Sequence, residues 1–226
     1  REREIEVEEM EDDTLDRDTR IKLSIGTKEQ DDADGLFNWP RGLEFDHHRG
    51  LLLVTDCYNH RVQVFSCDDE DDGGSFVSRF GEQGTQPGQL KKPWGLAIDH
   101  DHDRILVVEF ANNRVQSRSL SDQSLLSCVG QRGSRDIEFY YPRDIAIDKH
   151  RHRIIIVDAG NNRLVFLSSI DLSFLFEIGK RGSQPGEFNC PSGITIDDDR
   201  HRIIVADTYN HRVQVLSSID GSFLFE

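Results

Sequence analysis

Four hexapeptides in the sequence bring together residue types that can do acid–base chemistry. They are DCYNHR (56–61), EFANNR (109–114), DAGNNR (158–163) and DTYNHR (207–212). The first and last hold a carboxylate, a guanidinium and an imidazole, which can exchange a proton near neutral pH. The other two carry Asn113 and Asn162 where the first and last carry His60 and His211. An amide does not titrate, so this position is not a proton-transfer site and the hexapeptide is expected to be architectural.

The hexapeptide fits a turn between two strands. A leading acid can accept hydrogen bonds from free N–H groups of the turn, and the asparagine at the fourth position tolerates a positive φ. The closing arginine would begin the next strand opposite the acid, where the two would form an ion pair. We therefore predict no catalytic residue here but a structural turn motif, made by Asp56, Asn59, Arg61, Glu109, Asn112, Arg114, Asp158, Asn161, Arg163, Asp207, Asn210 and Arg212.

The positions of these turns reveal an internal repeat. The closing arginines are spaced by 53, 49 and 49 residues, and so are Pro40, Pro93, Pro142 and Pro191. Each unit contains four short strand-like runs separated by turn residues, and no amphipathic helical segment follows residue 20. In the last unit these runs are GITID (193–197), RIIVAD (202–207), RVQVL (212–216) and SFLFE (222–226). Four strands per repeat at this period predict an all-β fold, a β-propeller built of four-stranded blades.

The order P-x-G-I-x-I-D, then R-I-I-V-A-D, then x-x-N-H-R-V-Q-V resembles the NHL repeat, in four copies over residues 36–226. The resemblance implies a propeller, usually of six blades, with a binding surface built from loops on one face. Members of this family include TRIM-NHL-like regulatory proteins, in which the propeller follows RING and B-box modules, as well as bacterial receptor-kinase sensors and an amidating lyase. No RING or B-box cysteines occur in this sequence.

The repeat suggests how the chain is divided. We expect blades at about 36–81, 88–130, 137–179 and 186–226, all within an NHL-type propeller covering residues 21–226. Residues 21–26 look like the last strand of a preceding blade. This extra strand favours part of a larger propeller of about six blades over a four-bladed ring with a spare strand. Residues 1–20 are half acidic and are expected to form a disordered or helical extension.

Charge and cysteine content limit the classes of partner. The formal net charge is −15, and an acidic chain is a poor ligand for nucleic acid. No apolar run is long enough to span a bilayer, and no signal peptide is visible, so we expect a cytoplasmic protein without membrane contact. Four cysteines, Cys57, Cys67, Cys128 and Cys190, form no CxxC pair and are expected to be reduced, although the spacing leaves a disulfide between Cys57 and Cys67 open.

Function is expected on the face that carries the hexapeptide turns and the connections between blades, which we call the top face. Two rings of residues vary there: the residue after each proline and the tip of each turn. Aromatic residues and arginine dominate interface energetics, and loops on a rigid scaffold commonly bind partners. We predict a non-enzymatic scaffold that needs no cofactor and binds a protein or peptide through Arg41, Tyr58, Trp94, Phe110, Arg143 and Tyr209. The resemblance extends this to substrate recognition in a ubiquitin-ligase-like regulator.

Two other functions remain open. The first is a propeller hydrolase or lyase with a metal in the central channel, for which the candidate carboxylates Asp56, Glu109, Asp158 and Asp207 each have an arginine in the same repeat. The second is RNA binding by the top face, where Trp94 could stack on a base. RNA binding ranks third, because the segments that connect the blades are close to neutral.

The opposite face, here called the bottom face, is rich in histidine. Seven of the nine histidines lie in turns between first and second strands: His47, His48, His100, His102, His150, His152 and His201. His100-Asp101-His102 could bind a metal, but a zinc site needs three or four converging ligands and these turns belong to different blades. We interpret them as solvated polar turns and assign no metal site.

Blades 1 and 2 each depart from the repeat. The insertion CDDEDDGG (67–74) explains the spacing of 53 residues in blade 1. It resembles the start of an EF-hand loop but places Arg79 where the loop needs a glutamate, so we expect a flexible acidic loop. In blade 2, Ser117 and Arg118 replace an apolar pair, which predicts a third strand that is less buried or lies against a partner.

Overall fold

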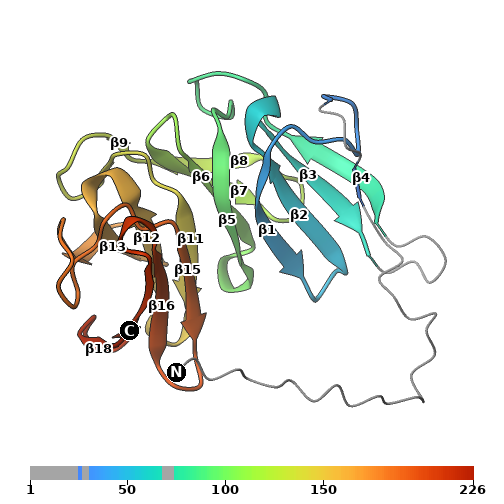
Figure 1. Ribbon diagram of the computed structural model, residues 1–226. Helices are drawn as coiled ribbons and strands as arrows, with labels where there is room; N and C mark the ends of the chain where they lie inside the picture. Colours follow the sequence, from blue (N-terminus) through green and yellow to red (C-terminus); the bar gives the residue numbers. More distant parts are fainter. Residues whose placement is uncertain (1–24, 27–30, 68–73) are drawn as a thin grey trace, which may run out of the picture.

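The computed structural model describes residues 25–26, 31–67 and 74–226, which form four separate four-stranded sheets and no α-helix (Figure 1). Each sheet is antiparallel with its strands in chain order, and the sheets are arranged as the blades of a propeller. The predicted all-β propeller is therefore confirmed. The expected extension at residues 1–20 lies outside the described residues, as do 68–73 of the insertion. Of the expected strand at 21–26, only Ile25 and Gly26 are described, and neither belongs to a strand.

In each blade the second strand ends at the acid of the hexapeptide and the third strand begins at its arginine. Blade 1 contains β1 (Pro40–Asp46), β2 (Leu51–Asp56), β3 (Arg61–Ser66) and β4 (Ser75–Phe80). Blade 2 contains β5 (Pro93–Asp99), β6 (Arg104–Glu109), β7 (Arg114–Ser119) and β8 (Leu125–Val129). Blade 3 contains β11 (Asp144–Asp148), β12 (Arg153–Asp158), β13 (Arg163–Ser168) and β14 (Phe174–Ile178). Blade 4 contains β15 (Gly193–Asp197), β16 (Arg202–Asp207), β17 (Arg212–Ser217) and β18 (Phe223–Phe225).

Short elements connect these strands. A two-residue parallel pair, β9 (Gln131–Arg132) and β10 (Glu138–Phe139), lies between blades 2 and 3. The described residues contain five single 3-10 turns: η1 (Cys57–Asn59), η2 (His100–His102), η3 (Lys149–Arg151), η4 (Ala159–Asn161) and η5 (Thr208–Asn210). Each of the five ends in a residue in the left-handed region, which only a few residue types adopt readily.

The first strand of each blade is the innermost. β1 packs against β5, β5 against β11, and β11 against β15, and residues of all four strands line a central channel. Each first strand begins at the top face and ends at the bottom face (Figure 1). Residues at the two ends of the first strands of different blades therefore come together at one mouth of the channel or the other.

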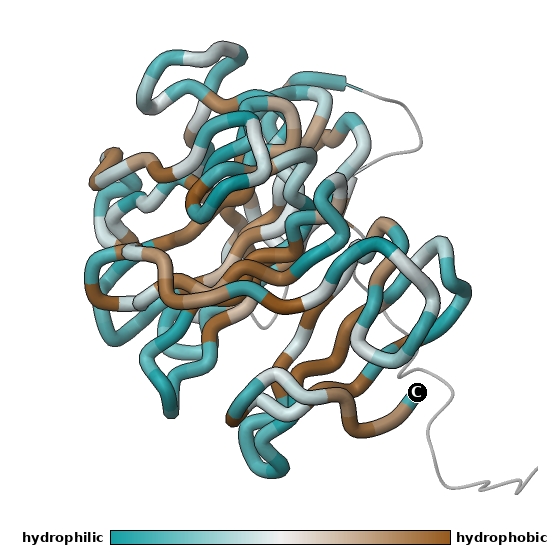
Figure 2. Tube along the Cα trace, turned by 90° about the vertical axis from the view of Figure 1, so that its left-hand side faces the viewer, coloured by the Kyte–Doolittle hydropathy of each residue, from teal (hydrophilic) through white to brown (hydrophobic). Residues whose placement is uncertain are grey.

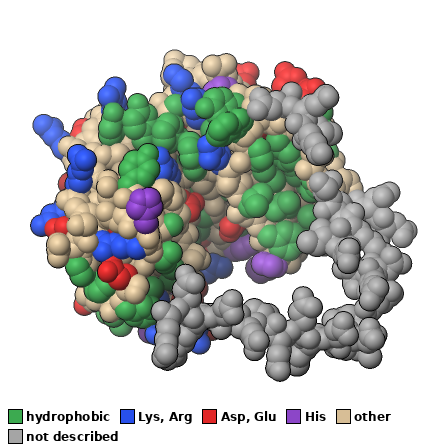
Figure 3. All heavy atoms as spheres, in the orientation of Figure 1, with side chains coloured by type: hydrophobic (Ala, Val, Ile, Leu, Met, Phe, Trp, Pro, Cys, Tyr) green, Lys and Arg blue, Asp and Glu red, His purple; other side chains and the backbone are tan. Residues whose placement is uncertain are grey.

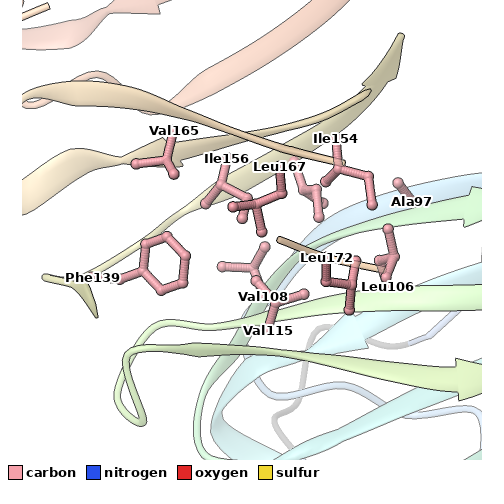
Figure 4. Packing of buried hydrophobic residues seen from close by; sticks show 11 residues of the cluster. Ala97, Leu106, Val108, Val115, Phe139, Ile154, Ile156, Val165, Leu167 and Leu172 are labelled. Atoms are coloured by element: carbon pink, nitrogen blue, oxygen red, sulfur yellow. The ribbon is translucent and has the colours of Figure 1, made fainter. Parts of the chain in front are cut away.

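The hydrophobic core lies between blades rather than within them. Three apolar clusters fill the junctions of blades 1 and 2, 2 and 3, and 3 and 4. In the middle cluster, Val108 and Val115 of blade 2 pack with Ile156 and Leu167 of blade 3 (Figure 4). Hydrophobic residues follow the strands, and hydrophilic residues concentrate in the turns (Figure 2). Burial of such a side chain contributes about 1.5–3 kcal/mol, so each blade depends on its neighbour for stability.

The third strand of blade 2 differs from the sequence expectation. β7 is buried along its whole length, and Arg118 is only 6% exposed, so the prediction of a less buried strand is wrong. The guanidinium of Arg118 lies 4.9 Å from the ring centroid of Phe80 in blade 1. It donates hydrogen bonds to the carbonyl oxygens of Gly88 and Gln123. A long side chain whose stem packs on an aromatic ring and whose head reaches carbonyl groups can replace an apolar residue at a blade junction.

Candidate functional site

The leading acid of each hexapeptide is the centre of a hydrogen-bond network. In blade 1, Oδ2 of the fully buried Asp56 accepts hydrogen bonds from Arg61 Nε at 2.8 Å and from Asn59 Nδ2 at 2.9 Å. Its Oδ1 accepts one from the backbone N–H of Asn38 at 2.7 Å. Arg61 also donates to the backbone carbonyl oxygens of Ala33 at 2.7 Å and Leu36 at 3.0 Å. Acid and arginine together attach the turn to the connection that precedes the blade.

The same network recurs in the other three blades, where Glu109 is bound by Arg114, Asp158 by Arg163 and Asp207 by Arg212. Each of these acids is fully buried and also accepts a backbone N–H from the preceding connection. All four candidate carboxylates for a channel enzyme are thus held by an arginine and by backbone groups.

The fifth residue of the hexapeptide joins one blade to the next. Nδ1 of His60 accepts a hydrogen bond from the backbone N–H of Lys92 at 3.0 Å. Oδ1 of Asn113 and Oδ1 of Asn162 accept equivalent bonds from Tyr141 and Cys190, both at 2.9 Å. All three acceptors have a φ between 54° and 57°. Histidine and asparagine are interchangeable here because both present an acceptor and both tolerate this backbone conformation.

The channel mouth on the top face brings together three of the residues expected to bind a partner. Arg41, Trp94 and Arg143 line a cavity of about 430 Å³ with Ser192. The guanidinium of Arg41 lies 4.2 Å from the Trp94 ring centroid, and that of Arg143 lies 5.6 Å from it. Both distances allow cation–π attraction.

Stacked aromatic rings extend this group across the top face. Trp94 stacks on Phe110 with ring centroids 4.8 Å apart, and Phe110 stacks on Tyr141 at 4.6 Å. Tyr58 packs edge to face against Trp39 at 5.6 Å, and its ring lies 4.7 Å from the ammonium group of Lys92. Arg41 connects the two groups, since its guanidinium is also 4.9 Å from the Trp39 ring. We call these eight residues the top-face cluster: Trp39, Arg41, Tyr58, Lys92, Trp94, Phe110, Tyr141 and Arg143.

The cluster contains five of the six residues predicted to bind a partner and excludes the sixth. Tyr209 is 62% exposed and has no ring or cation contact with the described residues. Sequence reasoning missed Trp39, Lys92 and Tyr141, which occupy the position just before each proline and have φ of 51° to 57°. The sequence could have identified them, because the residue before the proline varies among the four repeats as widely as the residue after it.

The cations of the cluster lack acidic partners. Within the described part of the chain, Arg41, Lys92 and Arg143 form no ion pair with a carboxylate. The Nε of Arg143 is buried and has no hydrogen-bond partner. Hydrophobic side chains and Lys and Arg side chains adjoin one another over the upper part of the molecule in Figure 3. The cluster thus combines open aromatic surface with uncompensated positive charge.

A residue missed from the sequence lies deeper in the same cavity. Asp144 occupies a position that is glycine in the other blades, namely Gly42, Gly95 and Gly193. Its carboxylate accepts hydrogen bonds from the N–H groups of Ile145 at 3.0 Å and Ile194 at 2.9 Å. Burial nevertheless raises the pKa of Asp144 to about 6. The channel therefore contains a carboxyl group that titrates near neutral pH.

The bottom face arranges its histidines differently from the sequence reading. His102 contacts Asp99 within its own blade, with Nδ1 and Oδ2 2.9 Å apart. His100 instead lies against His48 of blade 1, with ring centroids 4.2 Å apart. His100 and His102 therefore do not share one ligand site, and the contacts between turns of neighbouring blades were not visible in the sequence.

Further features bear on the environment of the protein. Cys57, Cys128 and Cys190 carry free thiols, and burial raises the pKa of Cys57 and Cys128, which keeps them protonated and poorly reactive. None of the helical segments in the described residues has the length and apolar character needed to cross a membrane.

Comparison with solved structures finds propellers of similar shape. A catalytically inactive virginiamycin B lyase from Staphylococcus aureus matches at 14% identity and a TM-score of 0.59, over 82% of this chain and 54% of the other. Hydrazine synthase from Kuenenia stuttgartiensis matches at 13% identity and a TM-score of 0.61, over 89% and 52%. A Lactobacillus plantarum protein matches at 16% identity and a TM-score of 0.60, over 83% and 56%. The chain spans about half the length of these relatives, and the likeness concerns the fold alone.

Comparison with curated proteins finds no match. The family model of the NHL repeat matches residues 37–65, 90–116 and 188–216, which lie in blades 1, 2 and 4. Blade 3 repeats the same strand order, turn geometry and acid–arginine network. On these repeats, the chain belongs to the NHL-repeat family.

Proposed function

We propose that this propeller is a non-enzymatic scaffold that binds a protein or peptide through the top-face cluster. One observation carries the proposal: Trp39 and Tyr58 are 51% and 43% exposed, although other blades have Lys92 at the Trp39 position and Ala111 or Gly160 at the Tyr58 position. Exposed aromatic groups beside arginine are typical of interface anchors. The cluster stands on four-stranded hydrogen-bonded blades, and a preorganised surface loses little conformational entropy when a partner binds.

The charges of the cluster suggest the chemistry of the partner. Arg41, Lys92 and Arg143 have no described carboxylate to neutralise them, and carboxylates of a partner would complete them. The rings of Trp39 and Tyr58 offer apolar surface next to these cations. The surface therefore fits a segment that carries an apolar or aromatic residue flanked by acidic residues.

The stacking argues against the RNA alternative. Trp94 already contacts the Arg41 guanidinium and the Phe110 ring, and Phe110 also contacts Tyr141. A nucleic acid base would have to displace one of these groups before it could stack. The net charge of −15 adds a repulsive field for phosphates.

The enzyme alternative has less structural support than the binding proposal. The four acids of the turn network are held by arginines, and Asp144 accepts two backbone N–H groups. The structural likeness to a lyase does not extend to chemistry at 14% identity. A role beside a ubiquitin ligase has no support in the comparisons and is not part of the proposal.

The test begins with a peptide selected from a random displayed library against the whole chain. Its affinity is then measured by calorimetry for the wild type and for the combined Trp94→Ala and Arg143→Ala variant. We expect the double variant to lose at least about 100-fold in affinity, as for the loss of two interface anchors, while its thermal unfolding changes little.

Tyr209→Ala is the matched control, because Tyr209 is an exposed top-face aromatic outside the cluster. Binding should survive this change. Unchanged affinity of the double variant, or an equal loss with Tyr209→Ala, would contradict the proposed site. Peptide selection that fails while RNA is retained with a steep salt dependence would favour the RNA alternative.

A further inference from the structure

The first strands of the blades end in an acid whose partner differs in blade 1. In blades 2 and 3, Asp99 and Asp148 lie opposite Arg104 and Arg153 at the start of the second strand. These pairs form ion pairs of 2.8 Å and 2.7 Å. In blade 1 the residue opposite Asp46 is Leu51. The carboxylate of Asp46 therefore lacks the guanidinium that compensates its equivalents.

The charge on Asp46 is incompletely compensated. The side chain is fully buried, and Oδ2 has no hydrogen-bond partner. Oδ1 accepts hydrogen bonds from the N–H groups of His48 at 3.0 Å and Arg49 at 3.2 Å. The Arg49 guanidinium is partly exposed, and its Nε lies 3.9 Å from Oδ2. Arg49 also binds the carbonyl oxygen of Leu120 at 2.8 Å, so it is engaged elsewhere. A buried carboxylate in this state favours a further cation.

Two imidazoles lie beside this carboxylate. His48 comes from the turn that follows β1, and His100 comes from the corresponding turn that follows β5. Packing of β1 against β5 brings the turns together, and His100 Nε2 lies 3.5 Å from Asp46 Oδ1. One ligand atom from each of Asp46, His48 and His100 lies within 4.8 Å of the others. In the described parts of the chain these are the sole three residues of such types that converge in this way.

We propose that Asp46, His48 and His100 form a binding site for a divalent transition metal of the zinc class. Two imidazoles and a carboxylate suit Zn²⁺ and its neighbours, whereas Mg²⁺ and Ca²⁺ prefer a full set of oxygen ligands. Tetrahedral bonds of about 2.1 Å place ligand atoms roughly 3.4 Å apart, close to the 3.5 Å between His100 and Asp46.

The remaining adjustment falls on His48. Its ring is inclined by 32° to that of His100 at a centroid distance of 4.2 Å, and its ligand atom must move from within 4.8 Å of the other two to the shorter separation that a bound ion requires. His48 is exposed and is free to make this movement. Both histidines line the bottom cavity of the channel, about 310 Å³ in volume, which leaves room for water as a further ligand.

The other blade junctions provide an internal comparison. The residues at the positions of Asp46, His48 and His100 are Asp99, Asp101 and Lys149 at the junction of blades 2 and 3. A lysine there supplies a fixed positive charge in place of a ligand, and Asp99 already has its arginine. The sister residues Asp101 and Lys149 thus define substitutions that the fold accepts at equivalent sites.

The test uses the whole chain after removal of metal with a chelator. Zinc chloride alone is titrated into the protein by calorimetry, with magnesium chloride as the comparison ion. We expect one zinc ion bound per chain at this site, no comparable heat with magnesium, and at least about 10-fold weaker zinc binding in His100→Lys, which removes a ligand and adds a positive charge. His150 occupies the same position in blade 3 that His48 occupies in blade 1, but it does not belong to the converging group. His150→Ala should therefore bind zinc as the wild type does.

Cobalt(II) gives a second readout that distinguishes the ligands. Visible absorption of a cobalt site with nitrogen and oxygen ligands should appear in the wild type and in His150→Ala and disappear in His100→Lys. Absence of zinc binding in the wild type would overturn the proposal. So would equal affinity in the His100→Lys and wild-type proteins, or thiolate-to-cobalt absorption that assigns the ion to a cysteine.

Discussion

His60 Nδ1 accepts a hydrogen bond from the backbone N–H of Lys92 at 3.0 Å and thereby links blade 1 to blade 2. Asn113 and Asn162 make the corresponding links to the blades that follow them. His211 has the same backbone conformation, with φ of 54°, but no ring contact with the described residues. The same side-chain-to-backbone hydrogen bond thus joins the blades at three junctions, whereas the His211 ring has no partner among the described residues.

Removal of the imidazole acceptor should therefore lower stability through a lost hydrogen bond at His60 but not at His211. We expect His60→Ala to lower the free energy of unfolding by about 1–2 kcal/mol more than His211→Ala, because only the first change leaves a blade-to-blade N–H unbonded. Both variants share the strain of alanine in the left-handed region, so their difference isolates the bond. Urea unfolding of the two variants measures it, and equal losses would contradict the link.

The pH dependence of this link follows from the state of the ring. Burial lowers the pKa of His60, so the folded protein resists protonation that the unfolded chain accepts at about 6.5. The unfolded state then binds more protons as the pH falls below that value, and stability decreases. We expect His60→Asn to match the wild type at pH 7.5 and to be the more stable protein at pH 5. Parallel pH profiles of thermal unfolding for the two proteins would exclude a titrating role of His60.

The acid–arginine network should be most important where it is most buried. The side chain of Arg163 is 6% exposed and binds Asp158, whereas that of Arg212 in the last blade is 14% exposed. Removal of one partner of a buried ion pair costs about 3–5 kcal/mol because the other charge stays buried. We expect a loss of this size for Arg163→Ala and a smaller one for Arg212→Ala, measured by urea unfolding. The reverse order would show that burial does not set the importance of the pair.

Asp144 should destabilise the fold at neutral pH. Its pKa is raised to about 6 in the folded state, so its favourable contribution is complete below the unfolded value of about 3.9 and is lost as the pH rises through 6. Asparagine preserves an acceptor oxygen for the N–H of Ile194. We expect Asp144→Asn to raise the melting temperature at pH 7 by about 2–4 °C and to leave it unchanged at pH 4. A gain of the same size at both pH values would contradict the raised pKa.

The fold was predictable because the repeat is carried by residues with local structural roles. The proline, the turn acid and the arginine keep a common spacing, and each defines a strand end or a turn within one blade. The burial of Arg118 was predicted wrongly because local polarity says nothing about the carbonyl groups that meet it, Gly88 from the preceding connection and Gln123 from the following loop. The strands and turns within one blade can be inferred from its own sequence, but the side-chain contacts between neighbouring blades cannot.

In the candidate site, too, features set within one blade were predictable and contacts between blades were not. Arg41, Trp94 and Arg143 were found because they follow equivalent prolines at the channel mouth. Asp144 was missed although it interrupts a column of glycines, because its burial depends on the neighbouring blade. The approach of His48 to His100 likewise depends on how one blade is rotated against the next, which residue spacing does not encode.

The tryptophans provide the most direct measurement of the central claim. The chain has two, Trp39 and Trp94, and both belong to the top-face cluster. In Trp39→Phe protein the emission reports on Trp94 alone, so titration with the selected peptide follows the site itself. The account predicts a saturable change in Trp94 emission with the dissociation constant that calorimetry gives for the same Trp39→Phe protein. Tight peptide binding with unchanged Trp94 emission would show that the partner binds elsewhere.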